Sequence, residues 1–184
     1  VGITANPVVT TATDELDRSC SDGDCSLRDA AFVATVGSTI TFSAGLSGGT
    51  LTLTLGQLAL SKDVTLDATA LAGGFALDAD GDSRLFDVDA ATTATLRGLM
   101  LAGGAADNGA AVRNAGTLTL ERVLVTGNTA TNFGGGLHNS GTLTLVNTTV
   151  SGNTTGGSFG GGLYNSGTAT LAGATFSGNG ASLS

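Results

Sequence analysis

The amino-acid sequence predicts an all-β chain folded as a parallel β-solenoid, with about 25 residues in each coil and a short N-terminal capping helix. Three observations predict this fold. Residues 110–128, 135–153 and 161–179 are near-copies of one another, apolar residues alternate within each copy, and glycine and asparagine clusters divide each copy into short segments. Short segments repeated at this spacing do not close a sandwich, but they do form the successive turns of a solenoid.

The alternation of apolar and polar residues predicts strands. In the second copy Leu143 and Leu145 flank Thr144, and the other copies follow the same pattern. We expect three short strands in each coil, and each strand should pair in parallel with its counterpart about 4.8 Å away in the next coil. The leucines of successive copies then form inward columns that fill the core.

Asparagine recurs at two positions of the repeat and predicts two ladders of stacked side chains. We expect these positions to lie in turns with left-handed backbone, which asparagine tolerates, and we expect the amides to hydrogen-bond from coil to coil. The six residues are Asn114, Asn139 and Asn165 in one ladder and Asn128, Asn153 and Asn179 in the other.

The N-terminal quarter of the chain differs from the repeats. Residues 1–45 are assigned to an N-terminal strand, a cysteine loop and a capping helix, and residues 46–184 to the coils of the same structural domain. Ser26, followed three residues later by Asp29, has the spacing of a capping box, which predicts the start of a helix. We expect this helix to cover the open end of the first coil, because solenoids need capped ends.

Two cysteines, Cys20 and Cys25, lie close together around a polar spacer that contains glycine. We expect a local disulfide, with two free thiols as the alternative. A disulfide favours an oxidising, extracellular setting. The start at Val1, without a start methionine or an apolar leader, fits removal of a signal peptide, although an engineered start would look the same. With the disulfide, it leads us to expect a secreted or cell-surface protein.

Composition argues against several classes of partner. The net charge of −8 disfavours nucleic acid and anionic membranes, which both attract basic surfaces. No apolar run approaches the roughly 18 residues of a membrane-spanning helix, so we expect no membrane insertion. No motif predicts a bound cofactor.

Two segments resemble known families. "CSLRDAAFVA" followed by "STITF" resembles the N-terminal CSLREA-type motif of secreted bacterial right-handed β-helix proteins. "GGGLHNSGTLTLVNTTVSGNT" is similar to the repeats of polymorphic outer-membrane proteins and autotransporter passengers. The resemblance implies a right-handed parallel β-helix. It implies no single function, since such helices serve as adhesins, passengers, surface fibres and sometimes carbohydrate-active enzymes.

An enzymatic role is disfavoured, and we expect no catalytic residues. A carbohydrate-active β-helix needs carboxylates that converge on one face, yet all fifteen acids lie at or before Glu121. His138 shares its repeat position with Arg113 and Tyr164, which predicts an outward surface position for the imidazole.

One acidic stretch has partial calcium-loop spacing. The candidates are Asp78, Asp80, Asp82 and Asp89, at positions 1, 3, 5 and 12. Ser83 stands where such a loop requires glycine, and position 12 is aspartate rather than the usual glutamate. The preferred interpretation is therefore an acidic turn between coils, without a metal.

Threonine recurs at two outward positions of the repeat. The array resembles the threonine faces of ice-binding proteins, although threonine is also simply a good strand former. The two columns are Thr93, Thr117, Thr142 and Thr168, and Thr95, Thr119, Thr144 and Thr170.

Three functions follow as hypotheses. The preferred one is a non-enzymatic subunit of an extracellular fibre, a head-to-tail homopolymer formed by stacking of β-helix ends. An uncharged C-terminal end and the strand-like residues 1–13 favour it. The alternatives are a surface-displayed adhesin or passenger module that binds a glycan or protein through Arg113, His138, Tyr164, Phe133 and Phe159, and an ice-binding protein. For Phe133 and Phe159 the preferred interpretation is packing within the loops.

Overall fold

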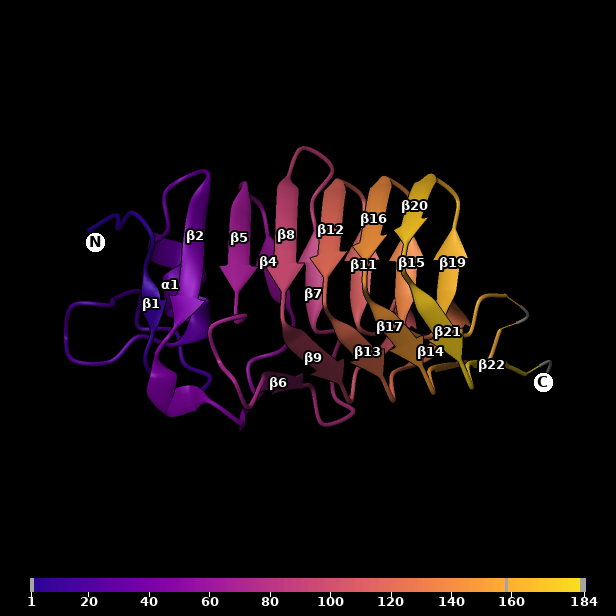
Figure 1. The fold of residues 1–184 in the computed structure, drawn as a ribbon, viewed down its shortest axis with the longest axis horizontal. Helices are drawn as coiled ribbons and strands as arrows, with labels where there is room; N and C mark the ends of the chain where they lie inside the picture. The colour runs from indigo at the N-terminus through magenta and orange to yellow at the C-terminus, as the bar shows by residue number, and fades with distance from the viewer. Residues whose placement is uncertain (1, 158, 183–184) are drawn as a thin grey trace.

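A computed structural model of the chain describes residues 2–157 and 159–182 and confirms a parallel β-solenoid (Figure 1). Residues 1, 158, 183 and 184 lie outside the described residues, so the last two positions of the predicted open end are among them. The coils stack along the long axis of the molecule, and the two ends of the chain lie at opposite ends of this axis (Figure 1). From β2 onward, register steps of 24 to 30 residues separate paired positions, such as Leu66, Leu96 and Leu120.

Four parallel sheets form the sides of the solenoid. The seven-stranded sheet contains β1 (Val8–Val9), β2 (Ser38–Phe42), β5 (Val64–Asp67), β8 (Thr93–Arg97), β12 (Thr117–Glu121), β16 (Thr142–Val146) and β20 (Thr168–Ala172). The six-stranded sheet contains β3 (Gly49–Thr52), β6 (Phe75–Asp78), β9 (Leu99–Ala102), β13 (Leu124–Thr126), β17 (Thr149–Ser151) and β21 (Thr175–Ser177).

The other two sheets complete each coil. The five-stranded sheet contains β4 (Leu58–Leu60), β7 (Phe86–Val88), β11 (Val112–Asn114), β15 (Leu137–Asn139) and β19 (Leu163–Asn165). The four-stranded sheet contains β10 (Ala105–Asn108), β14 (Thr129–Phe133), β18 (Thr154–Thr155) and β22 (Gly180–Ala181). The C-terminal coils therefore have four strands, and the expectation of three was wrong. The additional strands are short or largely exposed, so they lack the apolar alternation that predicts a strand.

The core consists of columns of aliphatic side chains. The longest runs through six strands of the seven-stranded sheet, and consecutive members are paired in register. Its members are Ile40, Leu66, Leu96, Leu120, Leu145 and Leu171. All but Leu171 are buried, and each buried leucine stabilises the fold by roughly 1.5–3 kcal/mol.

The asparagine ladders form as predicted, with amides that bond from coil to coil. Asn114 Nδ2 donates to Asn139 Oδ1 at 2.7 Å, and Asn139 Nδ2 donates to Asn165 Oδ1 at 2.6 Å. The second ladder repeats this pattern at 2.9 and 3.0 Å, through Asn128, Asn153 and Asn179.

The predicted reason for the positions of these asparagines was wrong. None of the six has a positive φ. In the second ladder the preceding glycines take the left-handed backbone instead, with φ of 66° at Gly127 and 63° at Gly152. The asparagines at 114, 128, 139 and 153 point inward and are buried, where their amides satisfy backbone carbonyl groups of the turns.

Helix α1 (Leu27–Val33) covers the N-terminal end, beside β1 and β2 (Figure 1). The predicted N-cap bond is present, because Ser26 Oγ accepts a hydrogen bond from the Asp29 N–H at 3.0 Å. The Asp29 carboxylate accepts from Ser26 Oγ at 2.7 Å and from the Arg18 N–H at 2.8 Å. Leu27 and Ala30 pack into the same core as the coils. A single 3₁₀ turn, η1 (Ala44–Leu46), precedes β3.

The N-terminal strand is paired within the chain. Val8 and Val9 pair with Thr41 and Phe42 of β2, and the Thr10 N–H donates to Cys25 O at 2.9 Å, which ties the cysteine loop to the same end. Strand β2 falls within the range 1–45, so the solenoid sheets begin before residue 46.

Candidate functional surfaces

The outward face of the seven-stranded sheet carries the two predicted threonine columns. One column, Thr93, Thr117, Thr142 and Thr168, is fully in register. The other extends further than the sequence predicted, because Thr39 and Thr65 pair into it below Thr95. This second column therefore has one threonine on each of six consecutive strands. The two additional residues were missed because their strands lack the rest of the repeat.

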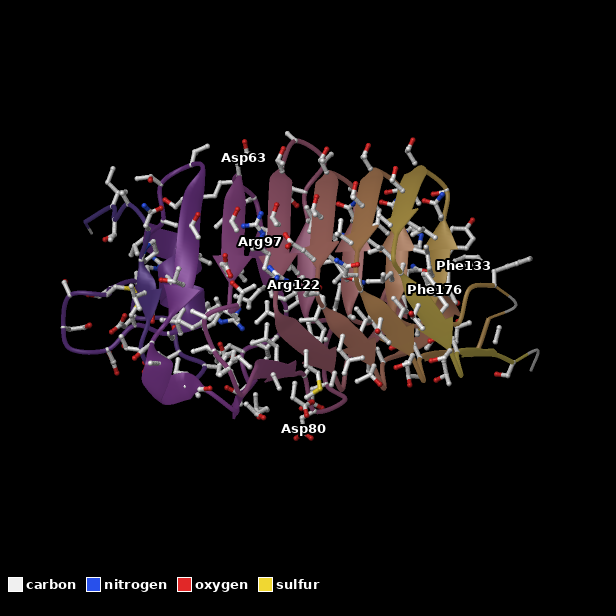
Figure 2. The ribbon with its side chains drawn as sticks, in the orientation of Figure 1. Asp63, Asp80, Arg97, Arg122, Phe133 and Phe176 are labelled. Carbon is white, nitrogen blue, oxygen red and sulfur yellow. A yellow bond between two sulfur atoms is a disulfide. The ribbon has the colours of Figure 1, made fainter. Side chains whose placement is uncertain are left out.

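A ladder of charges lies beside the threonines. Arg97 Nε is 2.9 Å from Glu121 Oε2, Arg97 Nη1 is 3.7 Å from Asp67 Oδ2, and Arg122 Nη2 is 3.0 Å from Glu121 Oε1. Figure 2 shows Arg97 and Arg122 near the middle of the solenoid. Since these ion pairs are partly exposed, each contributes little to stability. They interrupt the uncharged threonine face along one edge.

The outward face of the five-stranded sheet carries the predicted column of Arg113, His138 and Tyr164, which are paired in register. The imidazole of His138 stacks on the ring of Tyr164 with centroids 5.2 Å apart. Phe133 lies 4.8 Å from Tyr164 and 6.1 Å from Phe159, centroid to centroid. The sequence predicted the column of Arg113, His138 and Tyr164 and the Phe133–Phe159 pair, and the structure brings the four rings into one cluster.

Burial lowers the pKa of His138, and the charges of Arg113 and Arg84 lower it further, against an opposing hydrogen bond to the backbone. The Nδ1 atom of His138 is buried and has no hydrogen-bond partner among the described residues. The imidazole therefore disfavours protonation in the folded chain.

Below this column an ionic network reaches the N-terminal coils. Arg113 makes a two-pronged contact with Asp87, which is buried. Arg84 binds the side chain of Gln57 and the carbonyl groups of Asn108 and Gly109. Burial lowers the pKa of Arg84. Arg84 Nη1 also lies 4.0 Å from Asp87 Oδ2, so the two arginines share this carboxylate.

The structure places three carboxylates together in the cysteine loop. One oxygen from each of Asp17, Asp22 and Asp24 lies within 4.8 Å of the others, and the Cys20–Cys25 disulfide closes the loop as predicted. A hydrogen bond between Asp17 and Asp22 raises the pKa of Asp17 and lowers that of Asp22. These oxygens are ligands that Ca²⁺ accepts. All three side chains are exposed, and we assign no ion to them.

The four carboxylates with partial calcium-loop spacing do not form such a group within the described residues. Asp78 Oδ1 accepts a hydrogen bond from the Asp80 N–H at 2.8 Å, and Asp80 has a φ of 50°. This is a local acidic turn. Asp89 follows β7 on another side of the coil, because the chain changes direction between β6 and β7.

The last coil, formed by β19–β22, exposes the apolar positions that the preceding coils bury. Leu171 is 52% exposed and Phe176 is 40% exposed, whereas their counterparts Leu145 and Val150 are fully buried. Phe176 and Phe133 both lie near this end (Figure 2). In the described residues these four strands are the edges of their sheets.

At the other end a groove of about 400 Å³ separates α1 from the first coil. Its walls come from Leu16, Ala31 and Phe32 on one side and from residues 57–62 on the other, with Arg28 between them. The sequence did not predict this groove, because strand β4 belongs to a coil that has diverged from the repeats.

In the described residues, no helix has both the length and the apolar character needed to cross a membrane. Neither a family model, nor a curated protein, nor a solved structure matches the chain.

Proposed function

We propose that the protein is a non-enzymatic structural element that joins end to end with a second copy of itself through its last coil. The observation that carries this proposal is the exposure of Leu171 and Phe176 on strands with unpaired edges. In every earlier coil the same positions are covered by a coil of similar sequence. A second copy of β19–β22 offers a surface with the same spacing and the same apolar residues.

Charge supports self-association at this end. The chain carries a net charge of −8, so two copies repel each other at most approaches. Its acids all lie at or before Glu121, and its last basic residue is Arg122. Two copies that meet through β19–β22 therefore hold their charged parts as far apart as the solenoid allows.

The N-terminal end favours a closed pair over an open fibre. Helix α1, β1 and the cysteine loop already cover part of that end. A contact between two last coils is isologous and closes with two-fold symmetry, whereas a head-to-tail contact continues into a filament. The head-to-tail fibre predicted from the sequence requires the neighbour to displace this cap or to pair with the outer edges of β1 and β4.

An extracellular or cell-surface setting is part of this proposal. The Cys20–Cys25 disulfide supports it, because disulfides persist in oxidising compartments. The resemblance of "CSLRDAAFVA" and of the glycine-rich repeats to secreted bacterial β-helix proteins supports it too.

Light scattering coupled to size-exclusion chromatography tests the association. We expect a particle of twice 17.8 kDa at micromolar concentration, and we expect Leu171→Lys to convert it to the monomer, because the new charges repel each other across the contact. Thr142→Lys is the matched control. It adds the same charge to an exposed position on the side of the solenoid and should leave the dimer unchanged.

Two outcomes would redirect the proposal. Filaments seen by electron microscopy would establish the head-to-tail fibre in place of the closed pair. A wild-type monomer at all concentrations would overturn self-association. The surface-displayed adhesin or passenger module, with the Arg113–His138–Tyr164 column as its contact face, would then be the stronger hypothesis.

A second candidate function is ice binding, which the unbroken six-strand threonine column favours. The column presents a hydroxyl and a methyl group at each step of about 4.8 Å, on a sheet whose register is constant from Thr39 to Thr170. Inhibition of ice recrystallisation tests this candidate. Thr144→Tyr should abolish an activity that depends on the regular array, and an inactive wild-type protein would eliminate the candidate.

A further inference from the structure

Strand β4 is an edge strand that the fold leaves open. It is the last strand of the five-stranded sheet, and it pairs only with β7. The Leu58 N–H donates to Leu85 O at 2.8 Å, and Leu60 O accepts from the Asp89 N–H at 3.1 Å. Since alternate residues of a strand direct their backbone groups to opposite sides, the N–H and C=O of Ala59 point away from β7.

The backbone groups on this outer edge are unpaired. In the part of the chain that the structure describes, no hydrogen bond uses the N–H or C=O of Ala59 or of Ser61. Ala59 is exposed. Both residues line the groove of about 400 Å³ beside α1. A cleft of this size falls in the range of ligand-binding sites, and an open strand edge is a template for another strand.

Two cationic side chains mark the ends of the open edge. Arg28 donates to Gln57 O at 3.1 Å and is neutralised by Asp14 at 2.8 Å. Lys62 Nζ donates to Phe32 O and Ala34 O, each at 2.8 Å, which leaves a third N–H for another acceptor.

Lys62 differs from Arg28 because its positive charge is not paired with a carboxylate among the described residues. The ion pairs found among the described residues give Lys62 no carboxylate partner, and burial lowers its pKa. A carboxylate brought into the groove would therefore meet an uncompensated ammonium group. The opposite wall is apolar, since Leu16 and Phe32 are both large and exposed.

We propose that this groove binds an extended peptide segment of a partner protein, which adds a strand to the outer edge of β4. The peptide N–H and C=O groups pair with Ala59, one apolar side chain of the peptide packs against Phe32 and Leu16, and an acidic side chain reaches Lys62. This is strand addition, in which backbone bonds give affinity and side-chain contacts give specificity. The site is separate from the last coil, so its test is independent of the self-association test.

Two fluorescein-labelled pentapeptides probe both strand directions: Thr-Val-Thr-Val-Glu and Glu-Val-Thr-Val-Thr. We expect one of them to bind, as read by fluorescence anisotropy, and to shift the backbone amide resonance of Ala59 in the ¹⁵N-labelled protein. Replacing its glutamate by lysine should weaken binding, because the charge then opposes Lys62. Failure of both peptides to bind at millimolar concentration would overturn the proposal.

Ala59→Pro removes the outward N–H and leaves the β4–β7 ladder intact, since proline is tolerated on edge strands. We expect binding to weaken by about fivefold, the effect of one lost hydrogen bond. Ala59→Thr, which keeps the N–H, is the matched control. Unchanged binding by a folded Ala59→Pro variant would contradict strand addition. If that variant does not fold, the peptide can be changed instead. N-methylation of its central threonine and its second valine removes one N–H group on each side of the peptide strand, so a hydrogen bond to β4 is lost whichever side faces the protein.

Lys62→Gln should abolish the preference for glutamate over lysine in the peptide. Arg122→Gln makes the same change of charge on another part of the surface and should leave that preference unchanged. If Lys62→Gln still prefers glutamate over lysine in the peptide, Lys62 does not contact the acidic side chain. The proposed chemistry of the partner would then be wrong.

Discussion

At the scale of single residues, the buried asparagines determine how one coil is joined to the next. Each ladder amide makes bonds that no apolar residue replaces. Asn139 Nδ2 donates to Asn165 Oδ1 and to the carbonyl oxygens of Gly141 and Thr168, and Asn139 Oδ1 accepts from Asn114. Truncation therefore leaves buried polar groups in two neighbouring coils without partners, and this costs more than the loss of one hydrogen bond.

We expect Asn139→Ala to lower the free energy of unfolding by roughly 2–4 kcal/mol, as measured by urea denaturation. Asn132→Ala is the matched control. Asn132 is exposed and its side chain makes no hydrogen bond within the described residues, so its replacement should change stability by about 0.5 kcal/mol or less. Equal effects of the two substitutions would show that the ladder contributes no specific stability.

His138 gives stability a dependence on pH. Because burial lowers its pKa in the folded chain, the unfolded chain binds a proton more readily. The free energy of unfolding contributed by this group is therefore fully present above the unfolded pKa of about 6.5 and falls as the pH drops through that value. Thermal melts at pH 7.5 and 5.5 should show a larger loss in wild type than in His138→Gln. We expect a difference below about 1 kcal/mol, because the ring is partly exposed. The opposite order would contradict a lowered pKa.

At the scale of single elements, the N-terminal cap depends on one serine. Ser26 is fully buried, and its hydroxyl accepts the Asp29 N–H and lies 2.8 Å from Glu15 O, so it joins α1 to the cysteine loop. We expect Ser26→Ala to lower the free energy of unfolding by about 1–2 kcal/mol. Ser43→Ala is the control, since Ser43 precedes η1 without a side-chain capping bond. A loss of similar size in both variants would argue against a specific cap.

The elements that the sequence predicted are those that repeat. A stacked leucine or asparagine must match its neighbour one coil away, so the same residue type recurs at a fixed spacing in the sequence. The fold, the ladders and the threonine columns could therefore be predicted. The helix was readable from Ser26 and Asp29. The strands β14 and β18 were missed, because each buries one small side chain and has no apolar alternation.

Features formed by contacts that occur at only one place in the structure could not be predicted from the repeat. The open edge of β4 and its groove arise where the helix meets a diverged coil, and the grouping of Asp17 with Asp22 and Asp24 depends on how the disulfide folds the loop. In both places residues distant from the repeats come together once. No periodicity in the sequence reports such a contact.

At the scale of the whole molecule, stability should fall toward the last coil. Each coil of a solenoid is stabilised mainly by its two neighbours, and β19–β22 have only one neighbour within the described residues. We expect amide hydrogen exchange to be fastest in residues 161–181 and slowest in β8, β12 and β16. Raising the protein concentration should slow exchange in residues 161–181 if a second copy covers them. Uniform exchange along the solenoid would contradict this gradient.

The near-identity of the C-terminal coils has a consequence for refolding. A chain that pairs β12 with β20, and loops out the coil between them, would still set Leu120 against Leu171 and Thr119 against Thr170, with little loss of side-chain match. The repeated sequence therefore does not by itself determine which coil pairs with which. Helix α1 and the diverged coils β2–β7 occur once, and their unlike side chains accept only one order. Folding that starts from the capped end therefore adds the coils in a single register. Folding that starts among the near-identical copies can adopt several alternative registers.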